Sequence, residues 1–405
     1  MKKLIFGYGT TGKSVESYFQ KNNIEYLIYD DNKDINISNE FLFDDKKINE
    51  IDEVIISPGI KPTHPLLVKI KSKELRINTD IDIFNKFYNG KIIGVTGTNG
   101  KTTFVNLLTD YLNTQDIKSI AVGNVGKSPL EIIGEEYEYV VMELSSFQIY
   151  YLNNLNLHKA VVLNIYEDHL DWHRSFEDYR NAKLKILEFL PTENIKSEGY
   201  TPIRDPSNIF QDKSIRENLL KKGGILEIAS NLPFHEDTLC YFIEMVYDLG
   251  INMDFIKKFL SNYKTEEHRF ELVDKFNEIT FINDSKSTNF HSVSIATTKL
   301  NDGILVLHGL TKNISSKDLK ISDKVNSILV PKDMEIDLSG TKAKLIKINS
   351  IFDIEKELIK IIKPGDTVLF SCGGASFNDF NNYEERGNFF KSVVLNIKEK
   401  YGSVK

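Results

Sequence analysis

The sequence predicts an α/β protein in which strands and helices alternate along the whole chain. The alternation is clearest at residues 3–29 and 91–112, where a short apolar run, a glycine-rich turn and a helical stretch follow one another. This order is typical of parallel sheets covered by helices. Because a chain of 405 residues is too long for one ordinary core, we expect several separately packed domains.

Three domains are expected, all of them α/β. Residues 1–88 would form a Rossmann-like domain, residues 89–264 a central domain with a parallel sheet of the P-loop ATPase type, and residues 265–405 a second Rossmann-like domain. The boundaries are placed where the sequence turns polar, at residues 85–90 and 264–267. The strands expected from apolar runs are 3–6, 26–29, 53–56, 91–95, 139–142, 160–163, 280–282, 304–307, 327–330 and 367–370.

Composition and charge exclude several classes of protein. Apolar residues make up 41% and charged residues 27% of the chain, which is ordinary globular composition. A net charge of −7 opposes binding to nucleic acid, and no segment offers about 18 consecutive apolar residues for a membrane helix. The only cysteines, Cys240 and Cys372, lie far apart, which favours a reduced compartment. We therefore expect a cytoplasmic protein with no nucleic-acid or membrane partner. We also expect a monomer, although composition and charge do not bear on this.

The first glycine-rich turn is a candidate nucleotide site. Gly7, Gly9 and Gly12 match the G-x-G-x-x-G spacing between a strand and a helix, and Asp30 closes the next strand. Glycines at this spacing let backbone amides and a helix N-terminus approach a diphosphate, and the acid can accept hydrogen bonds from a ribose or base. The alternative is a tight turn that needs glycine only for its backbone conformation. The motif does not say which nucleotide would bind.

The second glycine-rich turn predicts a phosphate-binding loop. Residues 94–103 read Gly-Val-Thr-Gly-Thr-Asn-Gly-Lys-Thr-Thr and lie between an apolar strand and a helix. In this position backbone amides face phosphates, Lys101 neutralises the β and γ oxygens, and Thr102 offers its hydroxyl to Mg²⁺. The run departs from the strict P-loop template because Val95 replaces the first glycine. We prefer the phosphate loop over a purely structural turn and predict that the chain uses ATP or GTP.

Polar residues follow two further strands of the central domain. Glu143 comes directly after one apolar strand, and His169 lies in a polar run after the next one. Parallel sheets place their sites at such strand ends, which favours a metal-ligand or catalytic role for Glu143. His169 could bind Mg²⁺ or phosphate, or be an ordinary polar residue near a helix start, and His173 is interpreted as the latter. Composition alone would place Lys183 on a helix surface.

An ordered set of longer motifs runs through the chain. The most specific are Gly97-Thr-Asn-Gly-Lys-Thr102, Glu143-Leu-Ser-Ser-Phe-Gln148 and Asn283-Asp-Ser-Lys-Ser-Thr-Asn289. Further runs of the set are Ser57–Ile60, Gly123–Gly126, Asp168–Asp171, Tyr179–Lys183, His268–Glu271, Ser376 and Glu385–Gly387. The set resembles the Mur ligase family over almost the whole chain, and the second and third motifs are similar to those of its D-glutamate-adding members.

The resemblance implies an ADP-forming acid–amino-acid ligase of peptidoglycan precursor synthesis. Such an enzyme joins D-glutamate to UDP-N-acetylmuramoyl-L-alanine through an acyl phosphate. The implied cofactors are ATP and two Mg²⁺ ions, one near Thr102 and Glu143 and the other near His169 and Lys183. The lysine at this place in the family is carbamylated, which makes it an anionic oxygen ligand suited to Mg²⁺. The implied catalytic residues are Lys101, Glu143, His169 and Lys183.

The resemblance also assigns binding residues to each domain. The UDP part of the substrate would contact Thr10, Thr11, Asp30, Asn32, Ser57 and Gly59. ATP would contact Gly97, Thr98, Asn99, Gly100, Lys101, Thr102 and Thr103, with Arg269 and Asp284 from the third domain. The phosphate or sugar part of the substrate would contact Asn124, Ser145 and Gln148. D-Glutamate would contact Lys286, Thr288, Lys312, Ser376, Phe377 and Tyr383, which together supply the cations and hydroxyls that two carboxylates need.

Two stretches depart from the family's pattern. Residues 234–238 read Phe-His-Glu-Asp-Thr where the family usually carries a His-Asn pair, so Glu236 and Asp237 change the expected contacts to the adenine. His308 and Gly309 stand where a Gly-Gly pair is common, which makes Lys312 a weaker match than Thr288.

Other functions are compatible with parts of the pattern. A folylpolyglutamate synthetase-like ligase would share the architecture, a nucleotide-regulated binding protein would share the phosphate loop, and a Rossmann dehydrogenase would share the first glycine turn. Phosphate release that requires both UDP-N-acetylmuramoyl-L-alanine and D-glutamate would exclude all three.

Overall fold

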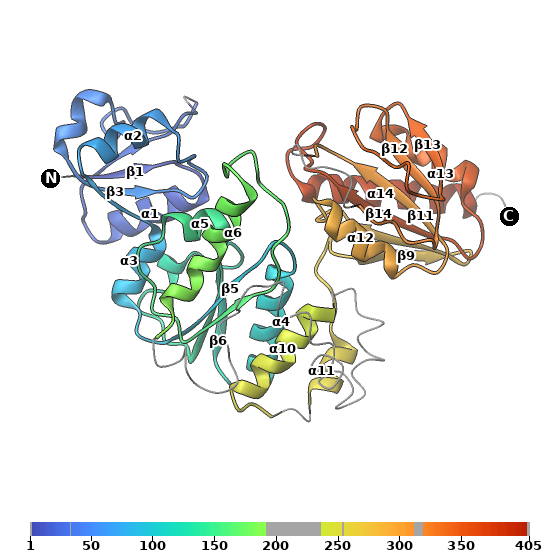
Figure 1. Cartoon of the computed structure of the whole chain (residues 1–405), viewed down its shortest axis with the longest axis horizontal. Coiled ribbons are helices and arrows are strands. Elements are labelled where there is room, and N and C mark those ends of the chain that lie inside the picture. Colours follow the sequence, from blue (N-terminus) through green and yellow to red (C-terminus); the bar gives the residue numbers. More distant parts are fainter. Residues whose placement is uncertain (1, 33, 192–235, 253–254, 312–318, 403–405) are drawn as a thin grey trace. The chain divides into compact units, whose positions relative to one another are not determined.

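The computed structural model describes residues 2–32, 34–191, 236–252, 255–311 and 319–402 (Figure 1). The chain packs into two compact units, formed mainly by Met1–Ile165 and by Asp254–Lys405. The segment Tyr166–His173 packs with the second unit. Three separate sheets are present in the described residues, two in the first unit and one in the second. The division into three domains stays a prediction.

The first sheet is parallel, with strand order β2-β1-β3-β4. Its strands are β1 (Lys2–Phe6), β2 (Tyr26–Tyr29), β3 (Ile51–Ile56) and β4 (Arg76–Asn78), and its helices are α1 (Thr10–Lys21), η1 (Asp45–Glu50), α2 (Pro65–Ser72) and α3 (Asp80–Phe87). Val15 and Phe19 of α1 and Phe84 of α3 pack with Ile5 and Ile55 of the sheet. The polar stretch predicted as a linker at residues 85–90 begins inside α3 (Figure 1).

The second sheet is also parallel, with strand order β6-β7-β5-β8. Its strands are β5 (Lys91–Thr96), β6 (Ser119–Gly123), β7 (Tyr139–Glu143) and β8 (Lys159–Val162). The helical segments around it are α4 (Lys101–Thr114), η2 (Pro129–Ile132), α5 (Ser146–Tyr151), α6 (Phe176–Leu184), η3 (Lys185–Phe189) and α10 (Glu236–Asp248). The ends of β5 and β7 are neighbours, so the two sequence motifs that follow these strands meet at one edge of the sheet.

The two sheets of the first unit share one hydrophobic core. A single cluster of buried side chains runs from Ile5 and Phe84 around the first sheet to Val140 and Ile186 around the second. Burial of this apolar surface is the main force that holds the unit together.

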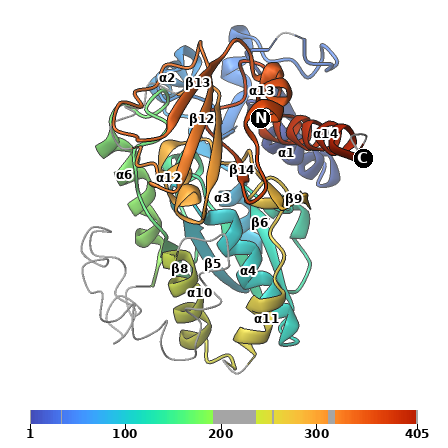
Figure 2. The same ribbon diagram turned by 90° about the vertical axis from the view of Figure 1, so that its right-hand side faces the viewer.

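The third sheet has strand order β13-β12-β11-β14-β10-β9 and is parallel except for β9. Its elements are β9 (Glu271–Phe276), β10 (Ile279–Asp284), β11 (Gly303–His308), β12 (Val325–Pro331), β13 (Lys344–Ile348), β14 (Thr367–Gly373), α11 (Ile256–Asn262), α12 (Phe290–Thr298), η5 (Ile351–Asp353), α13 (Ile354–Ile361) and α14 (Tyr383–Gly402). Leu305 and Leu307 pack with α12, whereas Ile304 and Val306 pack with α13 and α14. Alternate residues of β11 therefore face different helices, and Figure 2 shows these helices on opposite sides of the sheet.

The predicted α/β class with parallel sheets is confirmed. All ten strands predicted from the sequence are present: two have the predicted length, five are one or two residues longer and three are three residues longer. Strands β4, β6, β9 and β13 were not predicted. Among the described residues no helix is both long and apolar enough to span a membrane.

Candidate active site

The phosphate loop links the end of β5 to the start of α4. Gly97 has φ of +154° and Gly100 has φ of +82°, so both hold backbone conformations that side-chain-bearing residues rarely adopt. Gly100 is also the N-cap of α4, and Lys101 is the first residue of the helix. The N–H groups at the start of a helix and the helix dipole make this end a site for anions. The loop therefore has the backbone geometry that a phosphate site requires, and the binding of ATP by its residues stays a prediction.

Asn164, which directly follows the buried run of β8, shapes the loop. Its backbone carbonyl accepts a hydrogen bond from the Thr98 amide (2.9 Å). Its side-chain oxygen accepts one from the Asn99 amide (2.9 Å), and its side-chain nitrogen donates to the Asn99 carbonyl (3.1 Å). Sequence reasoning missed this role, although an asparagine at the end of a buried strand was a visible signal.

Two lysines converge on the loop. The Lys101 Nζ donates to the carbonyls of Gly97 (2.8 Å) and Thr98 (2.9 Å), and the Lys183 Nζ donates to the Gly97 carbonyl (2.8 Å). Lys183 is only 2% exposed and also lies over the ring of Tyr179, 4.8 Å from its centre. The expectation from composition, which placed Lys183 on a surface, is wrong. Lys183 reaches the loop because α6 lies beside it: the hydroxyl of Tyr179, in the same helix, is hydrogen-bonded to the hydroxyl of Thr98 (2.9 Å).

Glu143 is the last residue of β7 and is paired in register with Val95 of β5. It is 1% exposed. Its Oε1 accepts a hydrogen bond from the Asn124 amide (2.9 Å), whereas its Oε2 is buried and has no hydrogen-bond partner among the described residues. A buried carboxylate oxygen left in this state is costly unless a ligand completes it. Mg²⁺ prefers such oxygens and usually keeps few protein ligands, so Glu143 fits as a ligand of the predicted ion, whereas the share of Thr102 stays a prediction.

The second predicted Mg²⁺ site stays a prediction. Among the described residues, no three His, Cys, Asp or Glu side chains converge as a metal site. His169 has a left-handed backbone (φ +54°), and its amide donates to Asp168 (2.8 Å). It lies in the segment that packs with the second unit, whereas Lys183 lies in the first unit.

The predicted UDP-binding residues of the first sheet are joined by short hydrogen bonds. Asp30 accepts from the amides of Tyr8 (2.6 Å) and Asn32 (2.8 Å). Ser57 Oγ donates to the Gly7 carbonyl (2.7 Å). A Cβ at Gly12 would lie 2.2 Å from that same carbonyl, so glycine is required for close packing of α1 on the turn. The loops after β1, β2 and β3 therefore form one connected surface.

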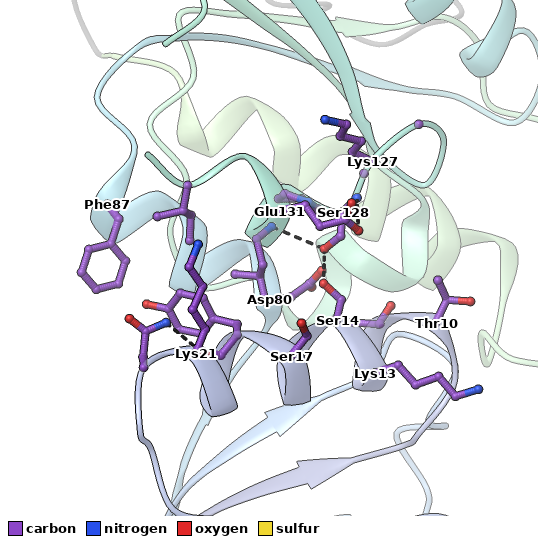
Figure 3. Close-up of a pocket in the computed structure, with 18 of the residues that line it drawn as sticks. Thr10, Lys13, Ser14, Ser17, Lys21, Asp80, Phe87, Lys127, Ser128 and Glu131 are labelled. Carbon is purple, nitrogen blue, oxygen red and sulfur yellow. Dashed lines mark hydrogen bonds between the residues drawn. The ribbon is translucent and has the colours of Figure 1, made fainter. Parts of the chain in front are cut away.

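A pocket of about 880 Å³ runs along α1 (Figure 3). Thr10 and Thr11 line it at the start of α1, together with Gln148 of α5. Ser14 lines it further along and donates to Ser128 (2.6 Å), which joins α1 to the segment before η2. The predicted substrate residues Thr10, Thr11 and Gln148 thus share one cavity, although Asn124 and Ser145 are not among its lining residues.

Ser145 and Gln148 also have a structural role. Ser145 is the N-cap of α5, and its Oγ accepts a hydrogen bond from the Gln148 amide (3.2 Å). The Gln148 side chain accepts in return from the Ser145 amide (2.9 Å). This capping box starts α5 directly after Glu143. Substrate binding by the two residues stays a prediction.

The second unit contains the two remaining residues predicted to bind ATP, Asp284 at the end of β10 and Arg269 just before β9. Asp284 is buried, and its oxygens accept hydrogen bonds from Ser287 (2.6 Å), Ser371 (2.7 Å) and the Phe270 amide (3.1 Å). Burial raises the pKa of Asp284 to about 6, while these hydrogen bonds oppose the rise. Arg269 pairs with Glu266 (2.7 Å).

The predicted D-glutamate residues are partly brought together. The Lys286 Nζ lies 3.6 Å from the centre of the Tyr383 ring. Thr288 is half-buried, Ser376 is 2% exposed and Phe377 is 71% exposed. Lys312 and the side chains of Glu236 and Asp237 lie outside the described residues.

A buried arginine missed by sequence reasoning holds this region together. Arg386 is 0% exposed and donates to the carbonyls of Ser285 (2.7 Å), His308 (3.2 Å) and Gly374 (2.9 Å). It therefore links residues at the ends of β10, β11 and β14. Its motif, Glu385–Gly387, was visible in the sequence without suggesting this role.

Comparison with known proteins decides the family. Residues 95–213 match the family described as Mur ligase middle domain. The UDP-N-acetylmuramoylalanine–D-glutamate ligase of Pseudothermotoga lettingae is 32% identical over 375 residues, covering 87% of this chain and 86% of the relative. The chain belongs to the Mur ligase family. Another family member, the UDP-N-acetylmuramoylalanine–D-glutamate ligase of Thermotoga petrophila, is 30% identical over 366 residues, covering 86% and 85%.

Solved structures of Mur ligases and a related ligase share the fold. The MurF ligase from Thermotoga maritima in complex with ADP has a TM-score of 0.53 at 16% identity, covering 98% of this chain and 94% of that one. A pseudomurein peptide ligase type C from Methanothermus fervidus has a TM-score of 0.53 at 16% identity, covering 98% and 100%. At this identity the likeness supports the Mur ligase fold alone.

Proposed function

We propose that this chain uses ATP to join D-glutamate to UDP-N-acetylmuramoyl-L-alanine in peptidoglycan precursor synthesis. The proposal rests mainly on one observation: the phosphate loop with Lys101 and the carboxylate of Glu143 lie at the same edge of the second sheet. One oxygen of this carboxylate is hydrogen-bonded, and the other is buried with no hydrogen-bond partner among the described residues. The similarity over most of the chain to D-glutamate ligases supports the choice of amino acid. We assign this activity to a protein of the cytoplasm that works as a monomer.

The chemistry requires activation of a carboxylate. An ionised carboxylate does not react with an amine at neutral pH, so the alanyl carboxylate oxygen first attacks the γ-phosphorus of ATP. This step forms an acyl phosphate and releases ADP. The D-glutamate nitrogen then attacks the carbonyl carbon, phosphate leaves, and the nitrogen loses a proton to solvent.

Residues of the first unit would stabilise the charge that develops on the phosphoryl group. Lys101 lies at the loop that we assign to the triphosphate, and its ammonium would exchange the carbonyls of Gly97 and Thr98 for phosphate oxygens. The amides at the start of α4 add fixed dipoles aimed at the same place. Both act by position and electrostatics rather than by covalent chemistry.

Glu143 Oε2 and Thr102 would hold a magnesium ion. When bound, Mg²⁺ neutralises phosphate oxygens and orients them for in-line transfer. Asn124 fixes the Glu143 side chain through the other oxygen, which leaves Oε2 directed to the ligand. We further propose that Lys183, as a carbamate, holds a second ion with His169.

The second unit would supply D-glutamate. Lys286, Thr288, Ser376, Phe377, Tyr383 and Lys312 are the residues that we assign to it. Lysine ammonium groups and hydroxyls can bind the two carboxylates of D-glutamate. Arg386 holds together the ends of β10 and β14, near which these residues lie. Arg269 and Asp284 of the same unit would contact ATP.

The test is a coupled assay of phosphate release by the purified full chain. We expect release that requires ATP, Mg²⁺, UDP-N-acetylmuramoyl-L-alanine and D-glutamate together, with the amide product identified by mass spectrometry. L-Glutamate and UDP-N-acetylmuramic acid serve as matched controls. Release with a pterin substrate, or no ADP in the presence of both precursors, would overturn the proposal.

A further inference from the structure

Helix α5 connects two groups of residues that the proposed function places on different sheets of the first unit. Its N-terminal end follows Glu143 and begins at the Ser145 cap. Its C-terminal end reaches the loop after β3, in the first sheet. The helix has six residues, and at about 1.5 Å per residue it is a short and stiff spacer.

At the C-terminal end of α5, the hydroxyl of Tyr151 contacts the loop after β3. Tyr151 is 8% exposed, and its hydroxyl donates to the carbonyl of Ile60 (2.7 Å). The Ile60 amide bonds to the Ser57 carbonyl (3.2 Å), and Ser57 bonds in turn to Gly7 (2.7 Å). An unbroken series of contacts therefore leads from Tyr151 to the first glycine turn.

A buried carboxylate makes a second contact between the same sheets. Asp82 of α3 is 4% exposed. Its Oδ1 accepts hydrogen bonds from the amides of Asn153 (3.0 Å) and Asn154 (2.9 Å), just beyond α5. Its Oδ2 accepts from the amide and the hydroxyl of Thr79 (both 2.8 Å). The Asn153 side chain also donates to the Ile77 carbonyl (2.8 Å), so the segment after α5 is held against β4 and α3.

We propose that Tyr151 and Asp82 are positioning residues that fix the nucleotide-sugar loops of the first sheet relative to Glu143 and the phosphate loop. The inference rests on the proposed function, because it assigns the two ends of one substrate to the two sheets. A substrate anchored by its UDP at Ser57 presents its carboxylate to the γ-phosphate only if the separation of the sheets is constant.

This role predicts a particular kinetic result. Neither residue belongs to the sites assigned to UDP or ATP, so each ligand should still bind when a contact is removed. The reaction needs both ligands in register, and a displacement of about 1 Å can slow an enzyme about 100-fold. Loss of a contact should therefore lower kcat while the affinities stay nearly constant.

The main variant is Tyr151→Phe, which removes one oxygen and keeps the ring. Tyr247→Phe is the matched control, because Tyr247 is in the same unit and 72% exposed. We expect Tyr151→Phe to lower kcat about tenfold, with dissociation constants of UDP and ATP within about twofold of the wild type by calorimetry. The control should keep full activity. An unchanged kcat, or a loss explained by weaker UDP binding, would overturn the proposal.

A second measurement does not depend on catalysis. Both native cysteines are buried, so spin labels can be placed at Val68→Cys of α2, which is 56% exposed, and at exposed Glu136→Cys before β7. We expect one narrow distance distribution, and a broader one when Tyr151→Phe or Asp82→Asn is added. An unchanged distribution in both variants would overturn the positioning role, whereas an inactive wild type with a narrow distribution would count against the proposed function alone.

Discussion

Glu143 and Asp284 are both buried carboxylates at the ends of parallel strands, yet their surroundings differ. Glu143 accepts one hydrogen bond, from Asn124, and its second oxygen has no hydrogen-bond partner in the described part of the chain. Asp284 accepts three, from two serine hydroxyls and a backbone amide. Position at a strand end is therefore the same in both cases, while the number of protein donors is not.

The different numbers of hydrogen-bond donors indicate that Glu143 and Asp284 have different roles. A carboxylate with a buried, unpaired oxygen is prepared for a ligand from outside the chain, such as a metal ion. A carboxylate that accepts three hydrogen bonds from the protein organises those donors, and here it connects residues at the ends of β10 and β14.

The largest expected effect concerns Lys101, which lies at the phosphate loop on the same sheet edge as Glu143. Lys101→Ala should abolish ligation, because it removes the cation at the start of α4 that we assign to the phosphates. The assay is ADP formation with both substrates present, and exposed Lys71→Ala is the control. Turnover of Lys101→Ala at more than a few per cent of wild type would contradict the assignment.

Glu143→Gln should lower kcat about 100- to 1,000-fold. The substitution keeps an oxygen for Asn124 but replaces the anionic oxygen that we assign to Mg²⁺. The Mg²⁺ concentration for half-maximal activity should rise as well, in a titration of phosphate release. The control is Glu138→Gln, at an exposed residue directly before β7, and it should behave as wild type. A normal Mg²⁺ requirement in Glu143→Gln would remove the metal from this site.

Asp284→Asn should have a smaller effect, about tenfold or less, comparable to the loss of one hydrogen bond. The two serine hydroxyls can turn to pair with the amide, so the strand ends stay connected. The measurements are kcat and KM for ATP, with Ser371→Ala as the matched loss of one donor. Equal losses in Asp284→Asn and Glu143→Gln would end the distinction between the two carboxylates.

The smallest effect concerns Asp80, a buried carboxylate in the first turn of α3, just after the end of β4. Its Oδ1 also has no hydrogen-bond partner among the described residues, and burial raises its pKa from 3.8 to about 6, with a further rise from Asp82. The folded state therefore favours the protonated carboxyl. That contribution to stability is fully present below about pH 4 and is lost as pH rises through about 6.

Asp80→Asn mimics the protonated form and should stabilise the protein above pH 7 but not near pH 4. Denaturant unfolding of wild type and variant at pH 4.5 and pH 7.5 measures the difference, with exposed Asp52→Asn as control. An equal increase in the free energy of unfolding at both pH values would contradict the raised pKa of Asp80. Full activity of Asp80→Asn would show that a buried carboxylate oxygen without a hydrogen-bond partner does not by itself mark a ligand site.

Most of the fold could be predicted from the sequence, because strands and the phosphate loop are marked by local sequence patterns. Short apolar runs predicted β1, β5 and β7. The position of Glu143 at a strand end predicted that it lies near the loop, and the pairing of β5 with β7 brings the two strand ends together. The burial of Lys183 could not be predicted in this way, because it depends on how α6 packs. The donors around Asp284, the carbonyls around Arg386 and the contacts of Asp82 also join residues that are distant along the chain, so no local pattern could predict them.

The pairing of Val95 with Glu143 has a consequence for variation in this chain. Side chains of a strand alternate between the faces of the sheet, so a one-residue insertion or deletion within Tyr139–Met142 would turn Glu143 to the opposite face. Substitutions of one apolar residue by another in the same strand would leave its direction intact. The length of β7 should thus tolerate less change than its composition.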